Sequence, residues 1–453
     1  MKLSFLGGTG TVTGSKYLIE HAGQKILLDC GLFQGYKNLR QLNWQAMPFD
    51  PASLDAVVLT HAHLDHSGAI PLLIRQGFRG PVYATPSTIA LCGLLLPDSG
   101  HLQEEDANYA NRHKSSRHEP ALPLYTEEDA RHALHAFRPL EFNQSLTLGN
   151  VQVRLHAAGH ILGASSAQFR SSLGSLMFSG DLGRSDDILM RGPEPIGQAD
   201  TLIVESTYGD RSHGSEDSAQ VLADVIGRTA ARGGMVVIPA FAVGRAQSLL
   251  YQIYLLKRAG RIPDLPVFLD SPMAIDTTDI YRRHRTEHRL SMEDCEGMSQ
   301  VAKFCRSVDE SRELGQMRYP AIIISASGMA TGGRILHHLR NYGSDHRSSI
   351  VFAGYQAGGT RGAKLVAGDR VLRIFGEDVR INAEVLSLPG MSAHADADQI
   401  LAWMKTLKQA PRQVFVTHGE PAAADALRWR IEHELGWHAS VPLLSSQVEI
   451  AEF

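Results

Sequence analysis

The sequence predicts an α/β protein with two parts: sheets covered by helices, and a separate parallel α/β module. Two observations lead to this class. The first two hundred residues consist mostly of short apolar runs between turn residues, with helical spacing between some of them. From about Tyr208 the pattern changes to helices and strands in regular alternation, which is typical of βαβ units.

Short apolar runs predict the strands of the first part, and their bounds are set by turn residues. These strands are expected at residues 2–7, 16–20, 25–31, 54–60, 81–85, 151–157, 175–181 and 201–207. A helix is expected at residues 67–77, because the spacing is helical between a serine and a glycine. Residues 101–120 are polar and mixed in charge, and are expected to form a solvated helix and loop.

Alternating helices and strands continue to about Phe375, after which strand ends that carry histidines return. The tail is therefore expected to rejoin the first part and to leave the middle as an insertion. Helices are predicted at residues 215–234, 244–260 and 332–343, and strands at 235–241, 265–270 and 319–328. The tail predicts strands at residues 384–396 and 413–420 and an amphipathic helix at 423–436. The expected domains are residues 1–208 with 376–453, and the insertion 209–375.

Composition excludes several classes of protein. The chain has 453 residues, 43% of them apolar and 20% charged, which is ordinary for a globular protein of two or three domains. No apolar run approaches the roughly 20 residues that a bilayer requires, and no signal peptide is recognised, so a cytoplasmic protein is expected. The four cysteines have no metal-binding or disulfide spacing and are expected to be buried and free. The net charge of −4 gives no overall attraction to nucleic acid, so any polyanion site must be local.

A cluster of metal-binding side chains follows the predicted strand at residues 54–60. The segment "THAHLDHSG" places three imidazoles and one carboxylate between His61 and His66. On an extended backbone His61 and His63 point to the same side, and the chain then turns, so that Asp65 and His66 face a second position. Imidazole and carboxylate ligands together suit zinc, with manganese or iron as alternatives. The cluster therefore predicts a site for two metal ions.

Further ligands are expected at other strand ends. Three candidates each follow an apolar run: His160, Asp181 and His418. Any one of them alone would be interpreted as a polar group at a turn, so the prediction rests on the whole set. Asp181 is expected to bridge two ions about 3.5–4 Å apart. The expected ligands of one ion are His61, His63 and His160, and those of the other are Asp65, His66 and His418. Four other histidines are expected to have structural roles: His101, His156, His337 and His338.

These segments resemble the metallo-β-lactamase superfamily. The resemblance rests on "THAHLDHSG", on Asp29 in "LLDCG", on His160 in "GH" and on Asp181 in "SGD". The later segments "IPAFAVGRAQ", "SASGMATGGR" and "GYQAGGTRG" are similar to the β-CASP branch of that superfamily, which contains nucleases related to the mRNA 3′-end cleavage factor. The similarity spans nearly the whole chain.

The resemblance extends to the three motifs of the β-CASP branch. Glu205 in "VEST" matches motif A, His394 in "SAHAD" matches motif B, and His418 in "THGE" matches motif C. The resemblance implies an αββα core with the middle module inserted as a cap, and a nucleic-acid cleft between them. It also implies that Asp29 orients the ligand histidines and that His394, held by Glu205, protonates the departing 3′ oxygen. Asp65 is expected to be both a ligand and a catalytic residue.

The cap is expected to select the substrate, because the metal site by itself could equally open a lactam or a thioester. The segment "IIISASGMATGGR" predicts a strand, a glycine-rich turn and a helix start, where free N–H groups and the helix dipole favour a phosphate. Arg334 would add a charged fork. Simple turn geometry is the alternative interpretation of the glycines. The expected RNA-binding residues are Arg245, Ser327, Gly328, Gly332, Gly333, Arg334, Gln356 and Thr360.

The predicted function is that of a zinc-dependent ribonuclease that hydrolyses phosphodiester bonds of single-stranded RNA, as an endonuclease, a 5′ exonuclease or both. About two zinc ions per chain are expected, with manganese as the substitute. In the family, histidine at motif C accompanies RNA processing and valine accompanies DNA repair, so His418 favours RNA. A DNA nuclease, a small-molecule metallo-hydrolase and a non-catalytic RNA-binding subunit are the alternatives. The expected partner is single-stranded RNA, no membrane is expected, and a homodimer stays open.

Overall fold

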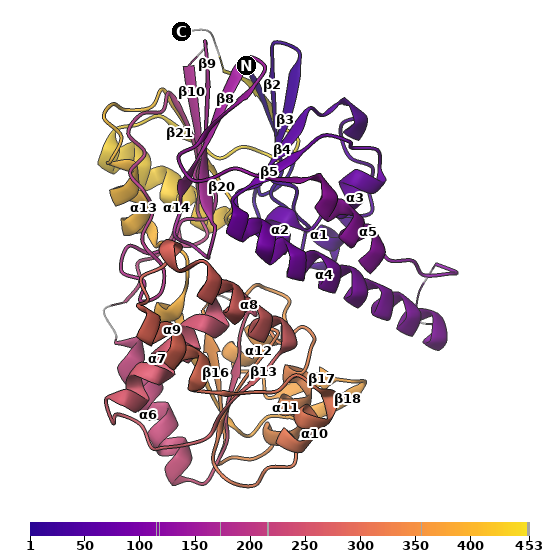
Figure 1. The fold of residues 1–453 in the computed structure, drawn as a ribbon, viewed down its shortest axis with the longest axis vertical. Helices are drawn as coiled ribbons and strands as arrows, with labels where there is room; N and C mark the ends of the chain where they lie inside the picture. The colour runs from indigo at the N-terminus through magenta and orange to yellow at the C-terminus, as the bar shows by residue number, and fades with distance from the viewer. Residues whose placement is uncertain (115, 117, 173, 215–216, 355, 451–453) are drawn as a thin grey trace. The chain divides into compact units, whose positions relative to one another are not determined.

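The protein is described from a computed structural model, which covers residues 1–114, 116, 118–172, 174–214, 217–354 and 356–450. The chain forms two compact units (Figure 1). The first unit combines Met1–Ser212 with His394–Phe453, and the second unit is His213–Ala393. The predicted insertion of the middle segment is therefore confirmed.

The first unit contains two seven-stranded mixed sheets. The spatial order in one sheet is β22 (Gln447–Glu449), β1 (Lys2–Phe5), β2 (Tyr17–His21), β3 (Gln24–Leu28), β4 (Ala56–Val58), β5 (Val82–Ala84) and β6 (Phe137–Pro139). The order in the other sheet is β21 (Ala439–Ser440), β20 (Gln413–Thr417), β11 (Thr201–Glu205), β10 (Gly174–Phe178), β9 (Ser165–Ser171), β8 (Val151–Ala157) and β7 (Ser145–Leu148). Strands from the start and the end of the sequence thus share each sheet.

The two sheets pack face to face around one apolar core. Phe5 on β1 contacts Phe415 on β20, with ring centroids 5.1 Å apart, and Tyr17 on β2 contacts Phe178 on β10 at 4.9 Å. Side chains alternate between core and solvent along β8, as expected for a half-buried strand. The unit is therefore a sandwich of two sheets.

Helices cover the outer faces of this sandwich (Figure 1). They are α1 (Lys37–Leu42), α2 (Leu64–Ser67), α3 (Ile70–Arg75), α4 (Pro86–His113), α5 (Glu127–Ala133), α13 (Ala397–Met404) and α14 (Pro421–Arg430), with short helical turns η1 (Pro51–Ser53), η2 (Leu134–Ala136) and η5 (Ile431–Leu435). Leu401 on α13 and Leu427 on α14 pack with Leu202 and Val414 of the second sheet. The core predicted from the resemblance, helices outside two sheets, is confirmed.

The second unit is a parallel α/β domain. Its six-stranded sheet has the order β14 (Lys303–Phe304), β13 (Val267–Asp270), β15 (Ile322–Ser325), β12 (Val236–Pro239), β16 (Ser349–Ala353) and β19 (Glu384–Leu388). Neighbouring strands of this sheet are parallel. Its helices are α6 (Ser218–Ala231), α7 (Arg245–Arg258), α8 (Pro272–Arg283), α9 (Met292–Gln300), α10 (Val308–Leu314), α11 (Ile335–Tyr342) and α12 (Arg361–Val366). The remaining elements are the hairpin β17 (Val371–Ile374) and β18 (Glu377–Arg380) and the turns η3 (Arg285–Glu287) and η4 (Pro389–Met391).

The second unit ends later than the sequence indicated. The predicted boundary after residue 375 assigns residues 376–393 to the first domain, whereas the compact unit runs to Ala393. The reason is that β19 pairs in parallel with β16, from Ser349 opposite Glu384 to Ala353 opposite Leu388. The predicted helix at 215–234 is α6, and its first two residues, 215 and 216, lie outside the described residues.

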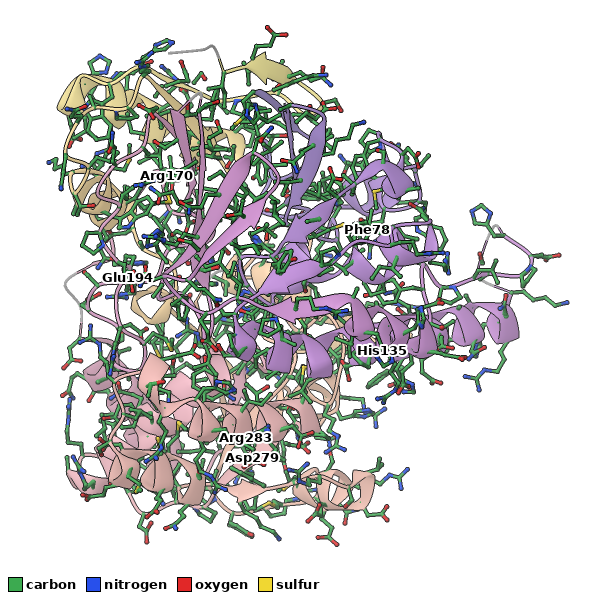
Figure 2. The ribbon with its side chains drawn as sticks, turned by 45° about the horizontal axis from the view of Figure 1, so that its top comes forward. Phe78, His135, Arg170, Glu194, Asp279 and Arg283 are labelled. Atoms are coloured by element: carbon green, nitrogen blue, oxygen red, sulfur yellow. The ribbon has the colours of Figure 1, made fainter. Side chains whose placement is uncertain are left out.

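Two further features concern the surface and the helices. Exposed charged side chains include Arg170 on β9 and Asp279 and Arg283 on α8 (Figure 2). Of the solvated helix and loop expected at 101–120, residues 101–113 are the second half of α4, which continues through Pro97 to His113, and residues 115 and 117 lie outside the described residues. Within the described residues, no helix combines the length and apolar character that crossing a bilayer requires.

Candidate metal centre

The turn that carries the histidine cluster leaves β4 and enters the short helix α2. Its backbone is held by Cys30 N, which donates a hydrogen bond to the carbonyl of His66 at 2.7 Å. Gly31 makes this close packing feasible, because a Cβ at this position would lie 1.6 Å from the carbonyl oxygen of Asp65. The turn that carries the histidine cluster is therefore fixed directly against the chain that follows β3.

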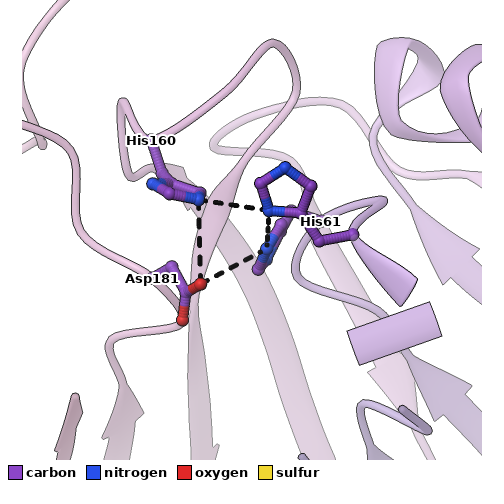
Figure 3. A group of neighbouring side chains, drawn as sticks. His61, His160 and Asp181 are labelled. Carbon is purple, nitrogen blue, oxygen red and sulfur yellow. Dashed lines mark hydrogen bonds and ion pairs between the residues drawn. The ribbon is translucent and has the colours of Figure 1, made fainter. Parts of the chain in front are cut away.

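One group of four donor side chains converges at this turn: His61, His63, His160 and Asp181. Nε2 of His61 and Nε2 of His160 each lie 3.2 Å from Nδ1 of His63. The same two nitrogens lie 3.5 and 3.7 Å from Oδ2 of Asp181, and Figure 3 shows them turned toward a common point. The four donor atoms lie within 4.8 Å of one another.

A second group lies beside the first and consists of Asp65, His66 and His418. Nε2 of His66 is 3.1 Å from Nε2 of His418, which is 3.6 Å from Oδ2 of Asp65. Oδ1 of Asp181 is 3.3 Å from Nε2 of His66, so the two oxygens of Asp181 face the two groups. A third, overlapping group is formed by Asp181, Glu205 and His418.

The residues present fit two divalent cations. Their seven donors are imidazole nitrogens and carboxylate oxygens, the ligand set of zinc and manganese sites. Burial lowers the pKa of His61, His63 and His160, which leaves neutral imidazoles with lone pairs to donate. Oδ1 of Asp181 is buried and accepts no hydrogen bond from the described residues, as expected of an oxygen that a cation would engage.

Asp29 lies behind the donor groups and contacts His66 directly and His61 through Thr60. Its Oδ2 lies 2.7 Å from Nδ1 of His66 and accepts a hydrogen bond from Thr60 Oγ1 at 2.8 Å, while its Oδ1 accepts one from Thr60 N at 2.7 Å. Because the Thr60 hydroxyl gives its hydrogen to Asp29, it can only accept from Nδ1 of His61, 3.2 Å away. That tautomer leaves Nε2 of His61 to face the donor group.

Thr207 lies beside Nδ1 of His418 as Thr60 lies beside Nδ1 of His61. No role was assigned to either threonine from the sequence. Nδ1 of His418 faces two oxygens, the Thr207 hydroxyl at 3.2 Å, which itself donates to the His418 carbonyl at 3.2 Å, and Oδ1 of Asp181 at 3.4 Å. A hydrogen on Nδ1 suits both oxygens and leaves Nε2 facing the second donor group. The available signals were their positions: Thr60 directly precedes His61, and Thr207 follows Glu205 by two residues.

Glu205 and His394 form a pair at the edge of the donor groups. Oε1 of Glu205 lies 3.2 Å from Nδ1 of His394 and accepts a hydrogen bond from Leu182 N at 2.7 Å. The His394 ring centroid is 4.3 Å from that of His160. Burial opposes the charged form of His394, but the carboxylate of Glu205 outweighs burial and raises its pKa. Among the described residues, His394 belongs to none of the metal-capable groups.

Most of the expected RNA-binding residues lie around one loop of the second unit, residues 326–334. The hydroxyl of Ser327 accepts hydrogen bonds from the backbone of Thr331 at 3.1 Å and of Gly332 at 3.3 Å. Gln356 donates to the carbonyl of Gly328 at 3.2 Å. Gly333 has a φ of +75°, in the region that favours glycine. The glycines are thus parts of a tightly bonded turn.

Three of the expected RNA-binding side chains point inward. Arg334 forms an ion pair with the buried Asp270, with its Nη1 2.7 Å from Oδ1. Thr360 is buried and caps α12, since its hydroxyl accepts from Ala363 N at 3.1 Å. Arg245, the first residue of α7, is also buried, and its guanidinium lies 3.7 Å from where a Cβ of Gly354 would stand.

The cysteines are buried and free, as predicted.

Comparison with known proteins identifies the chain's relatives. Residues 9–222 match the metallo-beta-lactamase superfamily, 246–365 the Beta-Casp domain, and 378–442 the Zn-dependent metallo-hydrolase RNA specificity domain. The chain is 37% identical to ribonuclease TTHA0252 of Thermus thermophilus over 93% of both chains. It is 32% identical to transcription termination factor FttA of Methanocaldococcus jannaschii, over 93% of this chain and 67% of that protein.

A solved structure supports the fold alone. A protein of unknown function from Enterococcus faecalis V583 superposes with a TM-score of 0.54 at 14% identity, over 99% of each chain. The two sheets, the inserted parallel domain and the matches along the sequence agree with one another. The chain belongs to the β-CASP branch of the metallo-β-lactamase superfamily.

Proposed function

We propose that the protein is a metal-dependent ribonuclease that hydrolyses phosphodiester bonds of single-stranded RNA, in the cytoplasm. The observation that carries the proposal is the convergence of seven imidazole and carboxylate donors beside the Glu205–His394 pair. The match to an RNA specificity domain and the similarity to a protein named ribonuclease favour RNA as the substrate. Two zinc ions, replaceable by manganese, are the proposed cofactors.

The proposed chemistry assigns separate tasks to separate residues. When bound, two divalent ions supply the Lewis acidity that activates a water and neutralises phosphate charge. Asp181 offers one oxygen to each donor group, and Asp29, Thr60 and Thr207 hold the ligand imidazoles in the tautomers that present Nε2. These residues fix the site before substrate arrives.

His394 is the proposed proton donor to the departing 3′ oxygen. Glu205 accepts from Nδ1 of His394 at 3.2 Å and stabilises the imidazolium, so Nε2 is the nitrogen that releases the proton. Glu205 is itself held by the backbone N–H groups of Leu182 and Thr207. The pair therefore has the geometry of a positioned acid with its orienting carboxylate.

Cleavage of matched strands tests the proposal. The purified chain, supplied with zinc or manganese, is incubated with 5′-labelled single-stranded RNA and with DNA of the same sequence. RNA cleavage is expected, together with its loss in Asp181→Asn, and the sizes of the labelled products separate internal cleavage from removal of 5′ nucleotides. Preferential cleavage of DNA would favour the alternative DNA nuclease, and lactam hydrolysis without RNA cleavage would contradict the proposal.

A further inference from the structure

A buried carboxylate organises the second unit at a distance in sequence from the residues it holds. Asp270 ends β13 and is completely buried. Its Oδ1 accepts from Nη1 of Arg334 at 2.7 Å, and its Oδ2 from Ser311 Oγ at 2.6 Å and from Nε2 of His338 at 2.7 Å. Figure 1 labels the elements involved: β13, α10 with Ser311, and α11 with His338. A buried charge requires such partners, because burial alone costs free energy.

Arg334 links this carboxylate to a second segment. Nη1 also donates to the carbonyl of Cys305 at 3.1 Å, and Nη2 donates to that of Arg306 at 2.7 Å. The side chain is 21% exposed. Three of its contacts thus lead into the unit, and its charge is compensated by Asp270. These contacts engage three of the five N–H donors of the guanidinium, which leaves few for a phosphate.

The loop that ends at Arg334 is fixed at its other points by backbone and side-chain contacts. Gly328 packs against Phe241, since a Cβ at Gly328 would lie 2.7 Å from a ring carbon. Arg361 donates to the carbonyl of Thr331 at 3.0 Å. Ile335 N donates to the carbonyl of Ala326 at 3.1 Å, which closes the loop. Arg334 is therefore the anchor between this closed loop and the interior.

We infer that Asp270 and Arg334 are positioning residues that set the shape of loop 326–334 for RNA, and that Arg334 itself does not contact phosphate. This inference rests on the proposed function and deepens it, because it separates the shape of the RNA-binding loop from its charge. His338 and Ser311 belong to the same network, so His338, for which a structural role was expected, supports the loop. Hydrogen bonds from His338, Ser311 and Arg334 overcome burial and lower the pKa of Asp270, in keeping with an ionised anchor.

Two roles for Arg334 predict different responses to salt. If it only positions the loop, Arg334→Ala and Asp270→Asn should each weaken binding of single-stranded RNA on the order of 10–100-fold, as expected for a misplaced loop. The slope of log affinity against log salt should stay at the wild-type value, because no phosphate contact is lost. The double variant should bind RNA no more weakly than the single variant with the lower affinity, since both substitutions break the same network.

A direct phosphate contact predicts the opposite pattern. Arg334→Ala would then reduce the salt slope by about 0.7, the usual value for one contact with a single strand. Asp270→Asn would release the guanidinium, and RNA would bind as tightly as to the wild type or more tightly. Either result would overturn the inference.

The ion pair of Asp345 and Arg347, away from Asp270, provides matched controls in the same unit. Arg347 is half exposed, and its Nη2 lies 2.8 Å from Oδ2 of Asp345. Asp345→Asn and Arg347→Ala make the same chemical changes as the test variants, and both should leave RNA affinity and salt slope at the wild-type values. Zinc content, measured on every variant, should stay at the wild-type level, because the donors lie in the first unit.

A milder variant tests the inference if Asp270→Asn does not fold. Ser311→Ala removes one of the three hydrogen bonds to Asp270 and should weaken RNA binding in the same direction by a smaller factor, again at unchanged slope. If Asp270→Asn shows no cooperative melting, this variant decides: unchanged RNA affinity would overturn the inference. Absence of RNA binding by the wild type would overturn the proposed function and the inference with it, whereas wild-type affinity in a folded Asp270→Asn would overturn the inference alone.

Discussion

Threonine hydroxyls decide which nitrogen of two histidines in the donor groups is available. Thr60 accepts from Nδ1 of His61, and Thr207 accepts from Nδ1 of His418, so in both rings Nε2 remains the donor. A hydroxyl achieves this only when its own hydrogen is engaged, which Asp29 and the His418 carbonyl ensure. The tautomers are therefore properties of the folded chain.

His394 is expected to act as a proton donor and not as a metal ligand. The two roles predict different properties for the variant His394→Ala. His394→Ala should keep its metals and its RNA affinity but lose roughly 10²–10⁴ in cleavage rate, the usual contribution of a positioned acid. With an aryl phosphodiester the loss should shrink greatly, because that leaving group departs without a proton. Rates on both substrates and the zinc content of the variant are the measurements.

The comparison of leaving groups makes this test specific. A variant that had lost a metal ion would be slow on RNA and on the aryl ester alike. Equal losses on the two substrates, or loss of zinc from His394→Ala, would show that His394 is not the proton donor. Arg347→Ala is a suitable control, since its partner, Asp345, lies in the second unit.

At the residue scale, the sequence predicted donors that lie close together in the chain or follow strands. His61, His63 and His66 are close enough for spacing alone to indicate a site. Arg334 was expected to bind phosphate, and its pairing with Asp270 could not be predicted, because Asp270 is 64 residues away and no local pattern connects them. Long-range pairing of this kind follows from the arrangement of strands.

At the element scale, the position of α2 depends on a missing side chain. The carbonyl of Asp65 on α2 occupies the space where a Cβ of Gly31 would stand. Gly31→Ala should therefore displace the turn that carries the histidine cluster, destabilise the protein by about 1–3 kcal/mol or more, and lower its zinc content. Denaturant unfolding and elemental analysis measure the two effects.

Gly227 on α6 provides the contrast. A Cβ at this position meets nothing within 4 Å, and its backbone is helical. Gly227→Ala should leave the zinc content unchanged and stabilise the protein by about 0.5–1 kcal/mol. If Gly31→Ala unfolded at the wild-type denaturant concentration with full zinc content, the proposed close packing at α2 would be wrong.

An ion-pair cluster holds β19 in the second unit and gives a pH dependence. Hydrogen bonds from Arg228, assisted by Arg232, lower the pKa of Glu384 from 4.5 to about 2. An acid with a lowered pKa stabilises the fold above its unfolded pKa, and the contribution disappears as the pH falls toward the folded value. Glu384→Gln should therefore be less stable than the wild type at neutral pH, and the deficit should shrink between about pH 4.5 and pH 2.

Unfolding of both proteins by denaturant across this pH range measures the deficit. A deficit that stays constant down to about pH 2 would mean that the charge of Glu384 contributes nothing. The same cluster explains the late boundary of the second unit, since Glu384 begins the strand that pairs with β16. The sequence indicated a strand there but could not indicate its partner strand, because pairing is not encoded in periodicity.

Helix α4 continues through a proline, which local sequence preference does not predict. Pro97 interrupts the apolar run, yet the helix continues from Pro86 to His113. A proline inside a helix removes one hydrogen bond, and here burial of Leu91, Leu95 and Leu96 on the same helix compensates. Tertiary packing therefore outweighs the local preference.

At the scale of the whole molecule, the centre is assembled from distant parts of one chain. His61 and His418 both belong to the first unit although the second unit separates them in sequence. The N–H of His418 donates to the carbonyl of Gly8 at 2.6 Å, which ties the tail to the loop after β1. The fold class and the insertion could be predicted from alternating patterns and from the resemblance. The contact between the tail and the loop after β1 could not, because no local pattern connects the two segments.

The central claim is that this assembled centre, loaded with metal, cleaves RNA. The most direct measurement is a titration of zinc into metal-free protein, with cleavage of 5′-labelled single-stranded RNA followed at each step and Asp181→Asn treated in parallel. Cleavage should rise to a plateau at about two ions per chain and stay absent in Asp181→Asn. Full cleavage by the metal-free protein in the presence of a chelator, or no cleavage by the fully loaded wild type, would contradict the account.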